Sequence, residues 1–126
     1  MSIPVDTAAL ADAVARYGEA AFLLSSAPRG GPHAVAVRVA WDGAALTTRA
    51  GNTSRTNIAE RADVTLLWPP VGEDDYSLIV DGTAAVEGAD GVRVTPVRAV
   101  LHRNPATTPA DDPGSECVTV LRAADR

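Results

Sequence analysis

Residues 33–49 read HAVAVRVAWDGAALTTR, and this stretch decides the expected fold. Four large apolar residues occupy every second position of its first half: Val35, Val37, Val39 and Trp41. This two-residue period is typical of a strand with one buried face. Asp42-Gly43 is a strong hairpin signal, and residues 45–49 return as the partner strand. The stretch therefore predicts two antiparallel strands joined by a tight turn.

Other apolar runs on both sides of this hairpin have the length of strands. They cover residues 20–24, 64–68, 76–87, 92–101 and 117–121. Gly82 interrupts the longest run, and the apolar pattern continues beyond it, so we expect a bulge or bend there and no chain reversal. Residues 104–114 are rich in proline and predict a loop before the last strand.

Only two short helices are expected. Asp6 or Thr7 can cap the first one, and Gly18 is a natural residue for its end. The second is expected over residues 55–61, because residues 51–54 offer three possible capping side chains. Many short strands with close turns and few helices favour a mainly β protein, either a barrel or a sandwich.

The composition excludes several classes of protein. A length of 126 residues with 46% hydrophobic content suits one compact domain, residues 1–126. No apolar run approaches the ~20 residues that cross a bilayer, and the first residues do not resemble a secretion signal. We therefore expect a cytoplasmic protein without a membrane partner. A net charge of -5 with scattered arginines argues against nucleic acid as a partner.

The residue types exclude several chemistries. All basic residues are arginine, so neither a lysine Schiff base to pyridoxal phosphate nor a Gly-Lys-Ser/Thr phosphate loop can form. Two histidines and one cysteine without ligand spacing predict no metal site. No Gly-x-Ser-x-Gly motif supports a hydrolase. His33 stands at the start of a strand. At such a position a histidine is more often a half-exposed residue of the strand end than a catalytic base.

Hydroxyl and guanidinium groups cluster just before and within the second expected helix. They belong to Thr47, Thr48, Arg49, Ser54 and Arg55. Free backbone N–H groups and the helix dipole favour an anion at a helix amino terminus, and Arg55 could add a two-pronged charged hydrogen bond. The cluster therefore predicts a phosphate-binding site. The alternative interpretation is a capped surface helix with solvated arginines.

Several short motifs follow one another in a defined order along residues 20–103. They are Gly31-Pro32-His33, Trp41-Asp42-Gly43, Leu46-Thr47-Thr48, Ser54-Arg55 with Asn57-Ile58, Tyr76-Ser77, Gly82-Thr83-Ala84 and Val100-Leu101-His102-Arg103. In this order they resemble the pyridoxamine 5'-phosphate oxidase-like family of FMN-binding split barrels, especially its small actinobacterial members. The resemblance implies a mainly β split barrel with two short helices. It also implies a homodimer with two identical cofactor sites at the interface.

Carried over by position, the resemblance implies that Arg38, Thr47, Thr48, Ser54 and Arg55 bind the cofactor. Further candidate cofactor-binding residues are Val39, Arg49, Trp68 and Ser77. The simplest interpretation of Trp68, which stands before Pro69-Pro70, is a core or dimer-contact residue, and the alternative is that a cofactor ring packs near it. Arg55 is expected to contact the cofactor phosphate, while Ser54 caps the helix or donates to the same anion. Thr56 stands where many relatives have a lysine, and Arg49 is a candidate to replace that charge.

The function implied by the resemblance is that of an FMN-dependent oxidoreductase with a small-molecule substrate. Oxidation of vitamin B6 is not expected, because Gly43 lies near the position of the substrate-phosphate lysine and the carboxy-terminal Arg-x-His segment is missing. One alternative is a reductase that uses the deazaflavin F420. Another is a cofactor-binding or structural dimer without turnover.

Overall fold

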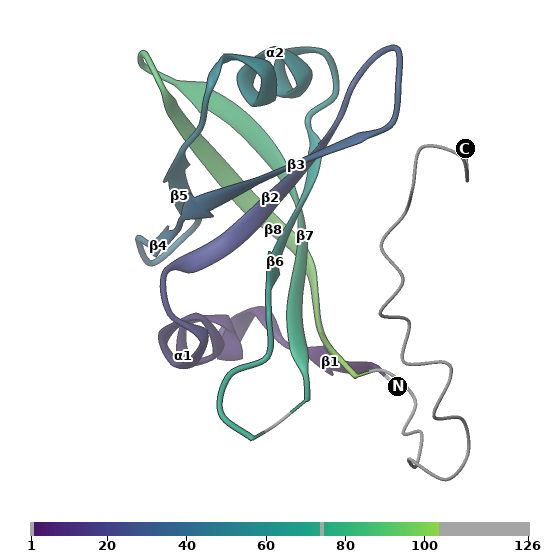
Figure 1. Cartoon of the computed structure of the whole chain (residues 1–126). Coiled ribbons are helices and arrows are strands. Elements are labelled where there is room, and N and C mark those ends of the chain that lie inside the picture. Colours follow the sequence, from purple (N-terminus) through teal and green to yellow (C-terminus); the bar gives the residue numbers. More distant parts are fainter. Residues whose placement is uncertain (1, 74, 104–126) are drawn as a thin grey trace, which may run out of the picture.

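Eight strands and two helices make up the part of the chain that the computed structural model describes, residues 2–73 and 75–103 (Figure 1). The strands are β1 (Ser2–Val5), β2 (Ala20–Ser26), β3 (Pro32–Arg38), β4 (Ala40–Trp41), β5 (Leu46–Arg49), β6 (Asp63–Trp68), β7 (Ser77–Glu87) and β8 (Gly91–His102). The helices are α1 (Thr7–Tyr17) and α2 (Asn52–Glu60). The predicted loop 104–114 and strand 117–121 lie outside the described residues.

All eight strands belong to one antiparallel sheet that curls into a half-barrel. Their order is β3-β2-β6-β7-β8-β5-β4, and β1 pairs with the end of β8. Curling brings β3, at one end of the sheet, close to β5 near the other end (Figure 1). Here Thr48 Oγ1 donates a hydrogen bond to the Arg38 carbonyl over 2.6 Å. The predicted split β-barrel is confirmed, and we call the line between β3 and β5 its seam.

The stretch that predicted the fold forms a hairpin with one difference. β3 and β4 are separate strands with Val39 between them, and the Val39 N–H donates to the Glu19 carbonyl over 2.8 Å, one residue beyond the pairing of β2 with β3. β4 then pairs with β5 as expected. In the turn between them, Gly43 has a φ of 96°, a conformation that glycine tolerates best.

Asp42 holds this turn together. Its Oδ1 accepts hydrogen bonds from the N–H groups of Ala44 (2.9 Å) and Ala45 (2.7 Å), and its Oδ2 pairs with Arg93. The two backbone hydrogen bonds, followed by the bond from Arg93, lower the pKa of Asp42 to about 2. A depressed folded-state pKa stabilises the protein above the ordinary carboxyl pKa, and this stabilisation is lost as the pH falls towards the folded value.

We therefore expect Asp42→Asn to lower the thermal unfolding midpoint at neutral pH. The difference from wild type should shrink as the pH is lowered from about 5 towards 2, since the wild-type carboxylate becomes protonated in that window. Thermal melts across this range measure the effect. Glu73→Gln, at an exposed residue on the loop after β6, is the control and should show no such trend. A constant difference at all pH values would contradict the assignment.

Gly82 marks the predicted bulge. The pairing of β7 with β8 shifts register between Asp81 and Gly82. A Cβ atom on Gly82 would lie 2.6 Å from the Thr95 carbonyl oxygen and 2.7 Å from Val94 Cγ1, so a side chain has no room.

We expect Gly82→Ala to reduce the free energy of unfolding by about 1–3 kcal/mol, measured by urea denaturation. Gly31→Ala, where a Cβ meets open space, should leave that free energy almost unchanged.

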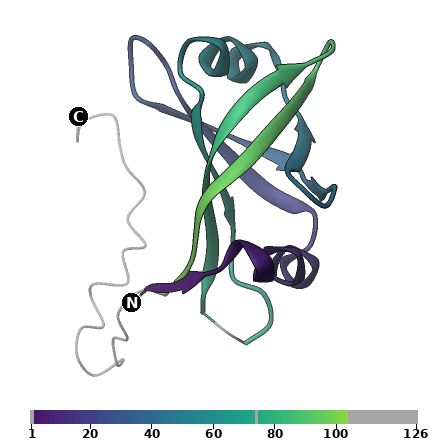
Figure 2. The ribbon, with the colours of Figure 1, turned by 180° about the vertical axis from the view of Figure 1, so that it is seen from behind.

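The two helices close opposite ends of the half-barrel (Figure 2). α1 buries Leu10, Val14 and Tyr17 against the core, and Gly18 ends it as predicted.

α2 begins at Asn52 rather than Arg55, with Gly51 at its N-cap position. Of the two roles expected for Ser54, capping this helix is therefore wrong, because Ser54 lies within the first turn, where it is 1% exposed. Donation to an anion stays a prediction. Neither helix is long and apolar enough to span a membrane.

Candidate functional site

A cavity of about 800 Å³ opens along the seam. Its lining residues come from β2, β3 and β5: Ala20, Ala36, Val37, Arg38, Thr47, Thr48 and Arg49. A second cavity of about 300 Å³ extends to the start of α2 and is lined by His33, Val35, Ala36, Val37, Arg49, Ala50, Gly51, Asn52, Thr53 and Ser54. Three residues line both cavities, so we treat them together as one groove, the seam groove. The volume of each cavity falls in the range typical of small-molecule sites.

The middle of the seam groove is apolar with hydroxyl groups beside it. Ala20 and Ala36 present small side chains, which leave room for a flat ring system. Thr47 Oγ1 donates to the Ala40 carbonyl over 3.4 Å, and Thr48 Oγ1 donates to the Arg38 carbonyl. Because each hydroxyl proton is used in this way, the oxygen lone pairs remain to accept hydrogen bonds from a ligand.

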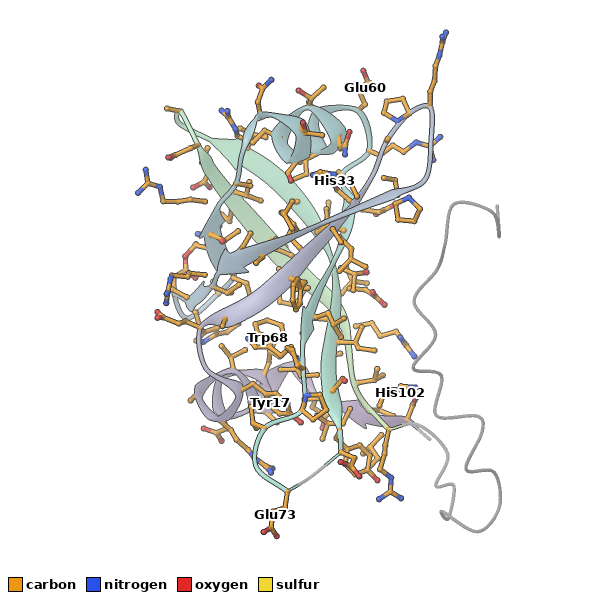
Figure 3. All side chains as sticks on the ribbon, viewed as in Figure 1. Tyr17, His33, Glu60, Trp68, Glu73 and His102 are labelled. Atoms are coloured by element: carbon orange, nitrogen blue, oxygen red, sulfur yellow. The ribbon has the colours of Figure 1, made fainter. Side chains whose placement is uncertain are left out.

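The end of the groove at α2 suits an anion. Gly51 supplies no capping side chain, and the first turn of α2 makes no side-chain cap hydrogen bond. The N–H groups of Asn52, Thr53 and Ser54 precede the first intrahelical bond, which runs from Arg55 N to Gly51 O over 3.1 Å. Together with the helix dipole, these N–H groups favour a negative charge. His33 also lines this end and lies below α2 (Figure 3).

Both arginines of the groove form ion pairs. Arg38 pairs with Glu19, and Arg49 donates to Asp90 Oδ2 through Nε (2.9 Å) and Nη2. The hydrogen bond from Arg49 is the main cause that holds the pKa of Asp90 below its ordinary value. The same bond raises the pKa of Arg49. Ion pairs as exposed as these contribute little stability, so a ligand anion can displace the carboxylates.

Five of the nine predicted cofactor-binding residues line the seam groove: Arg38, Thr47, Thr48, Arg49 and Ser54. Arg55 does not line it. Its Nη1 donates to the Ala89 carbonyl and its Nε to the Gly51 carbonyl over 3.3 Å, so the guanidinium group is held at the turn between β7 and β8. Val39 also lies outside the lining and is buried in the core.

Trp68 and Ser77 are the other predicted residues outside the groove lining. Trp68 is fully buried, and its Nε1 donates to the Gly18 carbonyl over 2.9 Å. Figure 3 shows Trp68 beside Tyr17 at the α1 end of the molecule. Ser77 begins β7, opposite His102 on β8. The structure thus places Trp68 in the core next to α1, and it does not bring either residue to the seam.

The groove residues without a polar side chain carry no signal in the sequence. Ala20 and Ala36 stand on the exposed face of paired strands, where small residues carry no local functional signal. Asp90, which contacts Arg49 from a position 41 residues away, carries no such signal either. Across residues 2–73 and 75–103, no cluster of three or more His, Cys, Asp or Glu side chains could hold a metal ion.

Comparison with known sequences gives a partial match. No family model matches the chain. An uncharacterized protein of Mycobacterium bovis is 50% identical over 62 residues, and this match covers 44% of our chain and 44% of that protein. The chain therefore aligns with less than half the length of this curated relative.

Solved structures match a larger part of the chain. A provisionally assigned pyridoxamine 5'-phosphate oxidase of Listeria innocua has a TM-score of 0.63 at 15% identity, covering 75% of this chain and 99% of that one. A FAD-binding protein of Mesorhizobium loti also reaches 0.63, at 13% identity, with 80% and 95% covered. The chain shares their split-barrel fold. An F420 reductase has the same fold at a TM-score of 0.55 and 16% identity, with 64% and 88% covered. The ligand must therefore be inferred from the residues of the seam groove.

Proposed function

We propose that this chain binds FMN in the seam groove and acts as an oxidoreductase on a small molecule. One observation carries the proposal: a single groove joins an apolar middle with small side chains to an anion-binding end. Ala20 and Ala36 leave room for the ring system, while Arg49 and the first turn of α2 suit the phosphate. The FAD-binding and pyridoxamine 5'-phosphate oxidase assignments of proteins with the same fold support it.

The protein's own part is binding and orientation. When bound, FMN would supply the redox chemistry. The hydroxyl oxygens of Thr47 and Thr48 can accept hydrogen bonds from the polyol chain of the cofactor, since their protons already go to carbonyls. The N–H groups at the start of α2, with Arg49, would balance the phosphate charge. These contacts fix the cofactor at both its polyol and its phosphate.

A homodimer is part of the same proposal. Phe22 on β2 is 40% exposed, and its pairing partners on the neighbouring strands are Ala36 on β3 and Leu67 on β6. Directly paired residues of antiparallel strands face the same side of a sheet, so these side chains form an exposed apolar strip. Ala36 also lines the seam groove. A second copy over this strip would bury Phe22 and cover the groove.

Two further expectations stay predictions. They are the organisation of residues 1–126 as a single domain and the cytoplasmic location of the protein.

Ligand titration tests the cofactor. The purified protein is titrated with FMN, riboflavin and F420, and binding is followed by the change in ligand fluorescence. We expect FMN to bind more tightly than riboflavin, because only FMN carries the phosphate. Tighter binding of F420 than of FMN would favour the deazaflavin alternative, which the fold of the F420 reductase supports. If none of the three binds, the FMN proposal fails in favour of a structural dimer.

A second experiment tests turnover. Bound FMN is reduced by light under anaerobic conditions with EDTA as the electron donor, and its absorbance is followed in the dark after addition of candidate electron acceptors. Reoxidation by an acceptor at a rate above that of free reduced FMN supports an oxidoreductase. The same rate with and without protein, across all acceptors, supports cofactor binding without turnover.

A further inference from the structure

The turn at residues 88–90, between β7 and β8, is attached by three contacts to the end of β5, to the residue after it and to the first turn of α2. The N–H of Ala50 donates to the Asp90 carbonyl over 2.9 Å. The Arg49 guanidinium binds the Asp90 carboxylate, and Arg55 Nη1 donates to the Ala89 carbonyl. The turn and α2 lie at the same end of the molecule (Figures 1 and 2). One short turn therefore holds both guanidinium groups that neighbour the anion-binding end.

Arg49 is the cation that both cavities of the seam groove share. Its Nε and Nη2 both donate to one oxygen of Asp90, and these are donors that a guanidinium group would also use for a phosphate. A phosphate and Asp90 would therefore compete for the same donors. The pair is exposed, with 80% of the Arg49 side chain and 45% of the Asp90 side chain open to solvent. Exchange of one anion for another costs little free energy at such an exposed site.

The backbone keeps Asp90 in place during such an exchange. The bond from Ala50 N to Asp90 O uses main-chain atoms only, so loss of the side-chain pair leaves the turn attached. The carboxylate is charged at neutral pH, because an aspartate ordinarily ionises well below pH 7, and the hydrogen bond from Arg49 lowers the pKa of Asp90 further. Asp90 therefore keeps its negative charge beside the expected phosphate position when Arg49 leaves it.

We propose that Asp90 is a built-in competitor for the anion of the seam groove, holding Arg49 in the free protein and releasing it when a phosphate group binds. With FMN as the ligand, this inference rests on the proposed function. Its consequence is selective: Asp90 lowers the affinity for ligands that carry a phosphate and leaves riboflavin, which has none, unaffected. Asp90 therefore sets how strongly the site distinguishes phosphorylated from unphosphorylated ligands.

Asp90→Asn tests the proposal, because it removes the charge with little change in size. Inorganic phosphate is titrated into the labelled protein, and NMR follows the backbone N–H groups of Asn52, Thr53 and Ser54 and the Nε–H of Arg49. Separate titrations compare FMN with riboflavin. We expect phosphate and FMN to bind about two- to fivefold more tightly to the variant, as loss of a weak competing ion pair implies, and riboflavin equally to both proteins.

Two further variants separate the role of this carboxylate from a general effect of charge. Asp90→Glu keeps the competing carboxylate and should stay within about twofold of wild type for phosphate. Glu73→Gln removes an exposed carboxylate on the loop after β6, outside the lining of the seam groove, and should leave the ratio of FMN to riboflavin affinity unchanged. If Glu73→Gln raises phosphate affinity as much as Asp90→Asn, the effect is one of net charge and the proposal is overturned.

The two proposals fail in different ways. Unchanged phosphate affinity in Asp90→Asn overturns the competitor role, whether or not FMN binds. Tighter phosphate binding by the variant, combined with no FMN binding by either protein, leaves the competitor role standing and removes FMN as the ligand.

Discussion

Arg49→Ala should weaken FMN binding by roughly 10- to 150-fold and leave riboflavin binding nearly unchanged. A charged hydrogen bond of the expected kind contributes about 1.5–3 kcal/mol, which corresponds to this range. Arg49 is the predicted phosphate ligand best placed for the role, because it lines both cavities of the seam groove. Its side chain is mostly exposed, so folding should survive the substitution. Fluorescence titration with both ligands measures the effect.

Arg55→Ala is the matched comparison for this result. Sequence analysis predicted that Arg55 contacts the phosphate, whereas its guanidinium group bonds to Ala89 and Gly51 and lies outside the groove lining. We therefore expect a smaller loss of FMN affinity than for Arg49→Ala. An equal or larger loss would mean that Arg55 leaves the turn to bind the phosphate. If FMN and riboflavin lose affinity equally in Arg49→Ala, the substitution has damaged the groove as a whole, and the phosphate is held elsewhere.

Most of the fold could be predicted because its strands carry a local signal. The alternation of Val35 and Val37 with smaller residues reports a strand with one buried face, and Gly82 reports a bulge. β1 was missed, because its four residues are mostly exposed and pair with the end of β8, which no local pattern reveals. The separation of β3 from β4 at Val39 was also missed, since the apolar alternation of Val37, Val39 and Trp41 continues through it.

The site was predictable only where its residues are adjacent in the sequence. Thr47, Thr48 and Arg49 follow one another on β5, and their residue types alone suggest a polar ligand. An ion-pair partner decides whether an arginine can bind a ligand anion, and such partners come from other strands or turns. Asp90, which binds Arg49, is an example. Trp68 shows the opposite problem: its residue type suits a cofactor contact equally well, and only the tertiary structure places it against Gly18.

The apolar strip around Phe22 leads to the second large expected effect. Phe22→Asp should raise the dimer dissociation constant by at least about 100-fold, because each interface would bury two unpaired carboxylates. Sedimentation velocity at micromolar concentration should then show a monomer where wild type is a dimer. Val86→Asp is the matched control, since Val86 is also 40% exposed but lies near the end of β7, away from the strip. A wild-type monomer at this concentration would contradict the dimer.

FMN affinity of the Phe22→Asp monomer then decides how far the site depends on the second copy. Ala36 belongs both to the strip and to the lining of the seam groove, so we expect separation of the copies to uncover the groove and weaken FMN binding. Riboflavin should lose affinity by the same factor, because the covered part of the groove is the apolar middle and not the phosphate end. A monomer that binds FMN as tightly as the wild-type dimer would mean that one chain supplies the complete site.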